Sequence, residues 1–152
     1  MTQALHTLLE HAEHQRDEAL ATLQQAEEAT RRLREQSAQL HTYRDEYRQR
    51  NPAGGGRSTS IDILRTHQNF MQRLDQALAQ LQGQIEAAES RSTRLRGELL
   101  ARETRVASVR KLLERRGQET QRVTARQDQR RSDDAASSPV WRSSTSVLPA
   151  LL

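Results

Sequence analysis

A sustained heptad repeat runs through most of this 152-residue chain and constrains its fold more than any other feature. From Leu5, alternating steps of four and three residues trace one mostly apolar or small stripe as far as Tyr47, and no Pro or Gly interrupts the chain before Pro52. A second stripe with the same spacing runs from Leu64 to Val123. Because heptad spacing gathers residues on one side of a helix, each stripe predicts one long α-helix.

Composition agrees with a narrow seam and argues against a thick core. Only 34% of the residues are hydrophobic and 3% are aromatic, whereas a globular domain is normally closer to half apolar. The 29% of charged residues would also suit a disordered chain. The regular spacing of the apolar residues favours two helices over disorder.

The two stripes are separated by signals that stop one helix and start another. Pro52 cannot continue a helix, and the glycines at 54–56 permit a sharp reversal. Ser60 and its neighbouring hydroxyl residues are suited to cap a new helix. We therefore predict an all-α fold, a long antiparallel two-helix coiled-coil hairpin over residues 1–131, with helix 1 at about 3–50, a turn at 51–57 and helix 2 at about 58–128.

The same reasoning predicts what lies beyond the paired helices. Folding back at the glycines should leave helix 2 extending past Met1 from about residue 110 onward. After Ser132 the composition turns to Ser, Asp and Ala and reaches Pro139. For residues 132–152 we predict a disordered Ser-rich tail.

The positive charge of the chain is concentrated in one segment. Residues 91–131 carry 13 basic and 5 acidic residues, a net charge of +8 in a chain whose total is +4. Such a segment could neutralise nucleic-acid phosphates, bind an acidic protein surface through Arg–carboxylate pairs, or be a solvated helix with internal Glu–Arg pairs. The segment has no aromatic residue to stack on bases, which weakens the case for single-strand binding.

The residues that usually carry catalysis are missing or scattered. There is no cysteine, and no Ser/His/Asp or paired-carboxylate arrangement can be singled out. His11 and His14 could share a helical face, but two imidazoles alone make a weak metal site. We predict a non-enzyme with no cofactor and no metal. Since the chain has neither a membrane-spanning apolar stretch nor a signal peptide pattern, we expect it in the cytoplasm.

The few aromatic residues gather where the hairpin should turn. Tyr43 and Tyr47 precede the turn and Phe70 follows it, so an antiparallel hairpin brings the three together. Aromatic side chains exposed on a charged helical pair suggest an anchor for another protein. The alternative is that Tyr47 and Phe70 only widen the seam where the helices separate.

These aromatic positions and their flanking runs resemble the flagellar FliJ protein family. The relevant features are the Tyr43–Tyr47 pair, the run HQNFMQRLDQA at 67–77 and the basic run VRKLLERR at 109–116. The resemblance covers about residues 1–131. It implies a hairpin similar to the γ subunit stalk of rotary ATP synthases.

The resemblance also implies a function. The family is a component of the bacterial flagellar type III protein export apparatus, needed for flagellum assembly and motility. The expected partners are the flagellar export ATPase and its regulator, the export gate protein FlhA and the flagellar export chaperones. Contact with these partners would hold the chain peripherally at the cytoplasmic side of the cell membrane.

Two sets of site residues follow for this sequence. The surface expected to contact the export gate consists of Gln36, Leu40, Tyr43, Tyr47, Phe70, Leu74 and Ala77. A basic protein-binding site near the end of helix 2 consists of Arg105, Arg110, Lys111, Arg115 and Arg116.

Other functions stay open at this point. The chain could be the equivalent stalk protein of a virulence type III secretion system. It could be a basic nucleic-acid-binding coiled coil that uses residues 91–131. It could also be a parallel homodimeric coiled coil with a structural role.

Overall fold

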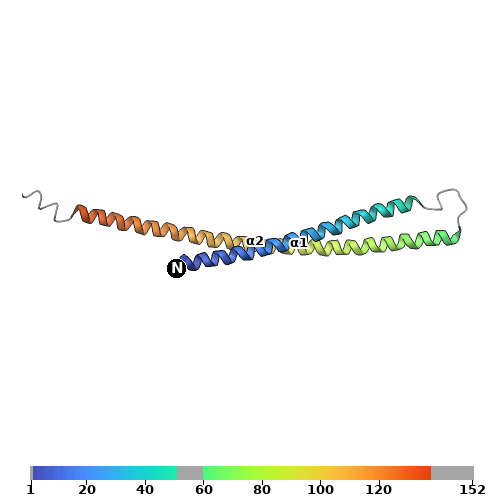
Figure 1. Ribbon diagram of the computed structural model, residues 1–152, viewed down its shortest axis with the longest axis horizontal. Helices are drawn as coiled ribbons and strands as arrows, with labels where there is room; N and C mark the ends of the chain where they lie inside the picture. The colour runs from blue at the N-terminus through green and yellow to red at the C-terminus, as the bar shows by residue number, and fades with distance from the viewer. Residues whose placement is uncertain (1, 51–59, 138–152) are drawn as a thin grey trace, which may run out of the picture. The chain divides into compact units, whose positions relative to one another are not determined.

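A computed structural model describes residues 2–50 and 60–137, which form two long α-helices (Figure 1). Helix α1 spans Thr2–Gln49 and helix α2 spans Ile61–Ala136. These described ranges contain no strand, so the predicted all-α helical hairpin is confirmed. The turn expected at 51–57 lies outside the described residues.

The described residues divide into two compact units. One unit is Ala12–Thr104, and the other combines the first residues of α1, up to His11, with α2 from Arg105 onward. In the 12–104 unit the helices run antiparallel, since Arg96 near the middle of α2 contacts Glu27 while His67 near its start contacts Tyr47.

The seam of the 12–104 unit follows the heptad prediction closely. Every predicted seam residue from Ala12 to Tyr47, and from Leu64 to Leu99, is buried or half-buried. The next seam position in this unit, Arg102, is exposed, and its guanidinium donates to Gln15 Oε1 at 3.3 Å. Removing these apolar side chains from water supplies most of the stability that a two-helix structure can have. A buried hydrophobic cluster consists of Leu23, Ala26 and Leu95, with Leu99 packed against it.

One layer of this seam is polar. Thr30 and Ser92 are 5% and 3% exposed, and their hydroxyl oxygens lie 3.5 Å apart. The Thr30 hydroxyl also donates to the carbonyl oxygen of Ala26 at 2.9 Å. The buried hydroxyl groups are therefore paired, which avoids the cost of an unsatisfied polar group.

The start of α2 shows why the chain begins a helix here. The backbone N–H of Ile63 donates to Ser60 Oγ at 3.3 Å, which is the bond expected from an N-cap serine. Asp62 lies in the first turn, where a carboxylate suits the positive end of the helix dipole.

The overlap of the helices in the second unit is longer than predicted. Thr2 lines one groove together with Arg116, Thr120 and Thr124. The prediction that α2 extends past Met1 from about residue 110 is therefore wrong. The register explains the difference: Tyr47, near the end of α1, packs on His67 rather than on the first turn of α2, so α1 reaches further along α2 than a fold centred on the glycines allows.

The end of α2 also differs from the prediction. The helix continues past 128 to Ala136, so residues 132–136 of the predicted disordered tail are helical. The backbone N–H of Ser137 still donates to the Asp133 carbonyl at 3.0 Å. Two alanines extend the helix because they are strong helix formers, and the restriction that Pro139 imposes falls only on the residue before it. Residues 138–152 lie outside the described part of the chain.

Candidate functional site

Four rings from both helices meet near the end of α1. The Tyr47 ring lies parallel to the His67 ring, with centroids 4.7 Å apart and planes 8° apart. The Phe70 ring is 4.5 Å from Tyr47, and Tyr43 meets Phe70 edge-on at 6.2 Å. The His67 ring nitrogen Nε2 also lies 3.2 Å from the Tyr47 carbonyl oxygen. Ring pairs in these geometries add about 0.5–1.5 kcal/mol each beyond their burial.

The cluster has a half-buried base and an exposed tip. Tyr47 and His67 occupy seam positions and are half-buried, whereas Tyr43 stands beside the seam with 47% of its surface exposed. The predicted aromatic cluster thus combines both interpretations, since Tyr47 and Phe70 pack between the helices while Tyr43 faces solvent.

An open groove begins at Tyr43 and runs between the helices away from the turn. Its volume is about 490 Å³, and none of its lining residues is charged. Two of the lining residues are leucines of the seam. The others occupy, on each helix, the two heptad positions that lie beside the seam on the same side. They are Gln36, Gln39, Leu40 and Tyr43 of α1 and Ala77, Gln80, Leu81 and Gln84 of α2. We call the surface formed by these eight residues the uncharged edge.

The other side of the same seam carries ion pairs between the helices. Arg34 pairs with Glu89, and Arg96 Nε lies 3.3 Å from Glu27 Oε1. These four residues occupy the heptad positions that flank the seam opposite the groove. Further toward the turn, Arg44 Nε lies 2.5 Å from Asp75 Oδ1. We call this side the charged edge.

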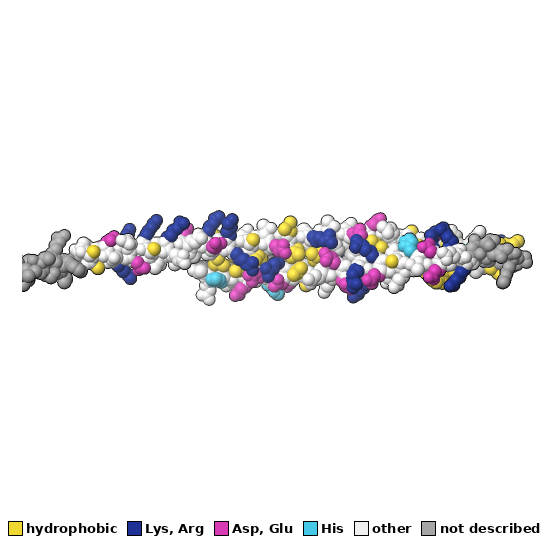
Figure 2. All heavy atoms as spheres, turned by 90° about the horizontal axis from the view of Figure 1, so that it is seen from above, with side chains coloured by type: hydrophobic (Ala, Val, Ile, Leu, Met, Phe, Trp, Pro, Cys, Tyr) yellow, Lys and Arg dark blue, Asp and Glu magenta, His cyan; other side chains and the backbone are white. Residues whose placement is uncertain are grey.

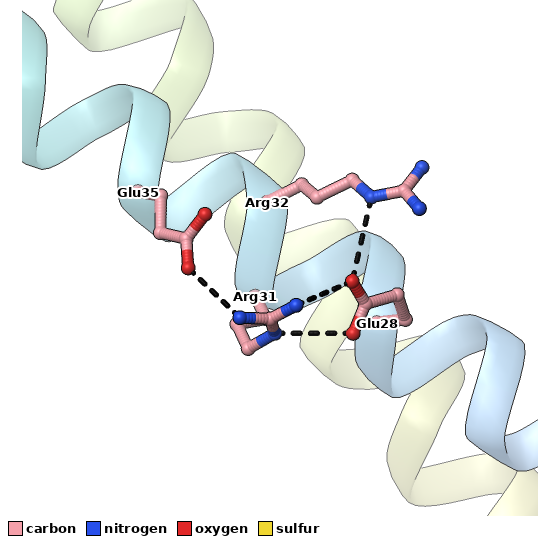
Figure 3. A network of polar contacts seen from close by, with 4 residues as sticks. All are labelled: Glu28, Arg31, Arg32 and Glu35. Carbon is pink, nitrogen blue, oxygen red and sulfur yellow. Dashed lines mark hydrogen bonds and ion pairs between the residues drawn. The ribbon is translucent and has the colours of Figure 1, made fainter.

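Within α1 a second set of charges forms an exposed network (Figure 3). Glu28 accepts bonds from Arg31 at 2.5 and 3.0 Å and lies 3.5 Å from Arg32, while Arg31 also reaches Glu35 at 3.0 Å. The hydrogen bond from Arg31 lowers the pKa of Glu28 below its ordinary value of 4.5, and the nearby positive charges act in the same direction. The same bond raises the pKa of Arg31.

Most of the residues predicted to contact the export gate fall on or beside the uncharged edge. Gln36, Leu40, Tyr43 and Ala77 line the groove, and Tyr47 and Phe70 belong to the ring cluster. Leu74 is different: it is 7% exposed and packs in the seam beneath this surface. Three further groove residues, Gln39, Gln80 and Gln84, were absent from the predicted set, although their heptad positions would have placed them on this side. The groove also contains Leu81, which the family resemblance implies as a further position of this surface.

The predicted basic site does not form one surface. Arg105, Lys111 and Arg115 are exposed on α2, whereas Arg116 is half-buried in the seam and lines the groove with Thr2. The fifth residue of the set is Arg110. Because an α-helix turns by about 100° per residue, the five residues point in three different directions around α2. Over the paired helices, Lys and Arg side chains are interspersed with Asp and Glu side chains (Figure 2).

The described residues contain neither a metal-binding cluster nor a membrane-spanning helix. No group of three or more His, Cys, Asp or Glu in residues 2–50 and 60–137 is placed to hold a metal ion. His14 Nε2 lies beside Glu18 Oε1 at 2.9 Å on the exposed surface of α1. Neither α1 nor α2 contains a segment apolar enough to cross a bilayer.

Comparison with known proteins supplies the family. The family model of the flagellar FliJ protein matches residues 1–145, which is nearly the whole chain. Searches of the curated proteins and of the solved structures gave no match. The chain therefore belongs to the flagellar FliJ protein family, a non-catalytic family with a role related to flagellar protein export.

Proposed function

We propose that this chain is an adaptor of the flagellar type III export apparatus and that its uncharged edge, together with the ring cluster, binds the export gate protein FlhA. The observation that carries this proposal is the exposed ring of Tyr43 at the end of a groove without charged residues. The resemblance of the sequence to the FliJ family names the partner, and the geometry offers a surface suited to one.

The energetics of protein interfaces favour this surface. A few aromatic residues usually dominate binding when they can be buried in the partner. Tyr43 makes edge and offset contacts with Phe70 and Tyr47 but keeps 47% of its surface in water. Its ring is thus held in place before binding, which reduces the entropy lost when a partner covers it.

The other expected partners rest on the family alone. We propose that α2 contributes to binding the export ATPase and its regulator, and that the exposed members of the predicted basic set, among them Arg105, Lys111 and Arg115, supply contacts. We also propose that the chain escorts export chaperones and supports motility. Through these partners it would be held peripherally at the cytoplasmic side of the cell membrane.

The test removes the exposed ring without disturbing the seam. We expect Tyr43→Ala to weaken binding of the purified chain to the cytoplasmic domain of the export gate by about tenfold, which corresponds to about 1.4 kcal/mol. Swimming of a strain carrying the variant should decline, while far-UV circular dichroism stays unchanged. The matched control is Leu100→Ala, because Leu100 is a large apolar residue that is 64% exposed and lies away from the groove.

Two results would reject the proposal. One is a wild-type chain that does not bind the gate domain. The other is a Tyr43→Ala variant that binds and swims as well as the Leu100→Ala control.

A further inference from the structure

We infer that the groove on the uncharged edge receives one α-helix of the partner, which lies along α1 and α2 as the third helix of a short coiled coil and presents an uncharged face. The inference rests on the proposed function for the identity of the partner. It adds the structural class of the bound segment and the chemistry of its contacting side chains.

The spacing of the lining residues is the first argument. On α1 they are Gln36, Gln39, Leu40 and Tyr43, and on α2 they repeat the same i, i+3, i+4, i+7 spacing from Ala77 to Gln84. This is the pattern with which a helix presents one face to another helix. Each wall therefore offers two helical turns, about 10 Å in length, to a rod lying in the groove.

The hydrogen bonding of the backbone groups is the second argument. At these positions the backbone N–H and C=O groups of both walls are bonded within their own helices. An extended peptide would bring unpaired backbone groups into the groove and find only glutamine side chains to pair with. A helix satisfies its own backbone groups and needs only side-chain contacts. The walls therefore favour a helical occupant over an extended one.

The charge pattern is the third argument. A charged side chain enclosed between walls without a counter-charge would lose its hydration without compensation. Gln36, Gln39, Gln80 and Gln84 can instead exchange hydrogen bonds with uncharged polar groups. The half-buried Leu40 and Leu81 beneath them suit apolar anchors, and the small side chain of Ala77 leaves room for one. We therefore expect the partner helix to contact the groove with a stripe of leucine-like side chains bordered by uncharged polar residues.

The crosslinking experiment uses the absence of cysteine from the chain. Full-length variants Gln39→Cys and Gln80→Cys each carry one thiol, on the α1 wall and the α2 wall respectively. Each is modified with a short photoactivatable crosslinker and bound to the cytoplasmic domain of the export gate. We expect crosslinks from both walls to fall within one partner segment, on residues three or four apart. Crosslinks on alternate residues, or on different segments from the two walls, would overturn the inference.

A charge test separates this inference from the proposed function. We expect the paired substitution Gln36→Glu with Gln84→Glu to weaken binding of the gate domain by tenfold or more. The matched control, Gln24→Glu with Gln76→Glu, adds the same charge to exposed positions outside the groove and should bind normally.

The outcomes then differ for the two proposals. If Tyr43→Ala weakens binding but the groove glutamates do not, the groove inference fails and the proposed function stands. If the wild-type chain does not bind the gate domain, both fail. If sedimentation shows a dimer that the groove glutamates dissociate, the occupant is a second copy of this chain and the inference is overturned.

Discussion

The two edges of the 12–104 unit flank the same seam and yet differ in chemistry. On the charged edge, Arg34 pairs with Glu89 and Arg96 with Glu27 across the helices. On the uncharged edge, glutamines, leucines and an exposed tyrosine border an open groove. The charged edge satisfies its side chains within the chain, whereas the uncharged edge leaves polar and aromatic groups available to another molecule.

The two edges therefore have different tasks: the charged edge favours one alignment of the two helices, and the uncharged edge offers a surface to another molecule. Exposed ion pairs contribute only about 0–1 kcal/mol each, so the charged edge does little for stability. It does distinguish the observed alignment of the helices from alignments that would place like charges opposite one another. Because the charged edge carries this task, the eight residues of the uncharged edge are not needed for it.

The largest effect should come from the seam that both edges share. Leu95 is 7% exposed and packs with Leu23 and Ala26. We expect Leu95→Ala to lower the free energy of unfolding by about 2–4 kcal/mol, measured by urea titration followed by circular dichroism. The exposed Leu100→Ala should change it by less than about 0.5 kcal/mol. Equal losses in both variants would show that the seam is not the source of stability.

A smaller effect should come from the ring cluster at the turn-side end of the uncharged edge. Tyr47 contacts His67, Phe70 and Tyr43 but is only half-buried. We expect Tyr47→Ala to cost about 2 kcal/mol of unfolding free energy, whereas Tyr43→Ala costs well under 1 kcal/mol because its ring is mostly solvated. A reversed order would mean that Tyr43, not Tyr47, holds the helices together.

Charge reversal on the charged edge should have a still smaller effect. Arg34→Glu places two acids opposite each other and should destabilise the chain by about 0.5–1 kcal/mol in low salt. Adding Glu89→Arg should restore the stability, and 1 M salt should remove most of the difference. Failure of the second substitution to rescue the first would show that these two residues do not interact in solution.

The smallest effect should come from the exposed network on α1. Because the folded-state pKa of Glu28 lies below 4.5, its contribution to stability is complete above pH 4.5 and is lost as pH falls through the lowered value. We expect Glu28→Gln to melt slightly below the wild type at pH 7 and together with it at pH 2. A difference that persists at pH 2 would have to come from a cause other than this carboxylate.

The seam was predictable because a heptad repeat reports its own buried face. Ala12, Leu23 and Leu95 are buried as their spacing requires, and Ser60 caps α2 as its hydroxyl suggested. The register between the helices was not predictable, since it depends on how the chain reverses and not on either repeat alone. For this reason the overlap reaching Thr124 and the pairing of Arg34 with Glu89 could only be seen in the structure.

The candidate site, too, was predictable in part: its residues could be predicted from the sequence, but the groove that they form could not. The family resemblance predicted Tyr43 and Ala77 as part of the candidate surface, and the heptad positions could have added Gln80 and Gln84 to that prediction. The groove itself depends on the two walls facing each other at matching heights, which again follows from the register.

The polar layer of Thr30 and Ser92 has a mechanical consequence for the 12–104 unit. A slip of one heptad would move Thr30 against Ile85 or Leu99 and separate the two hydroxyl groups, in addition to breaking the ion pairs. Translation of α1 along α2 is therefore opposed in both directions. Sliding of either helix along the other would therefore first have to separate Thr30 from Ser92 and Arg34 from Glu89.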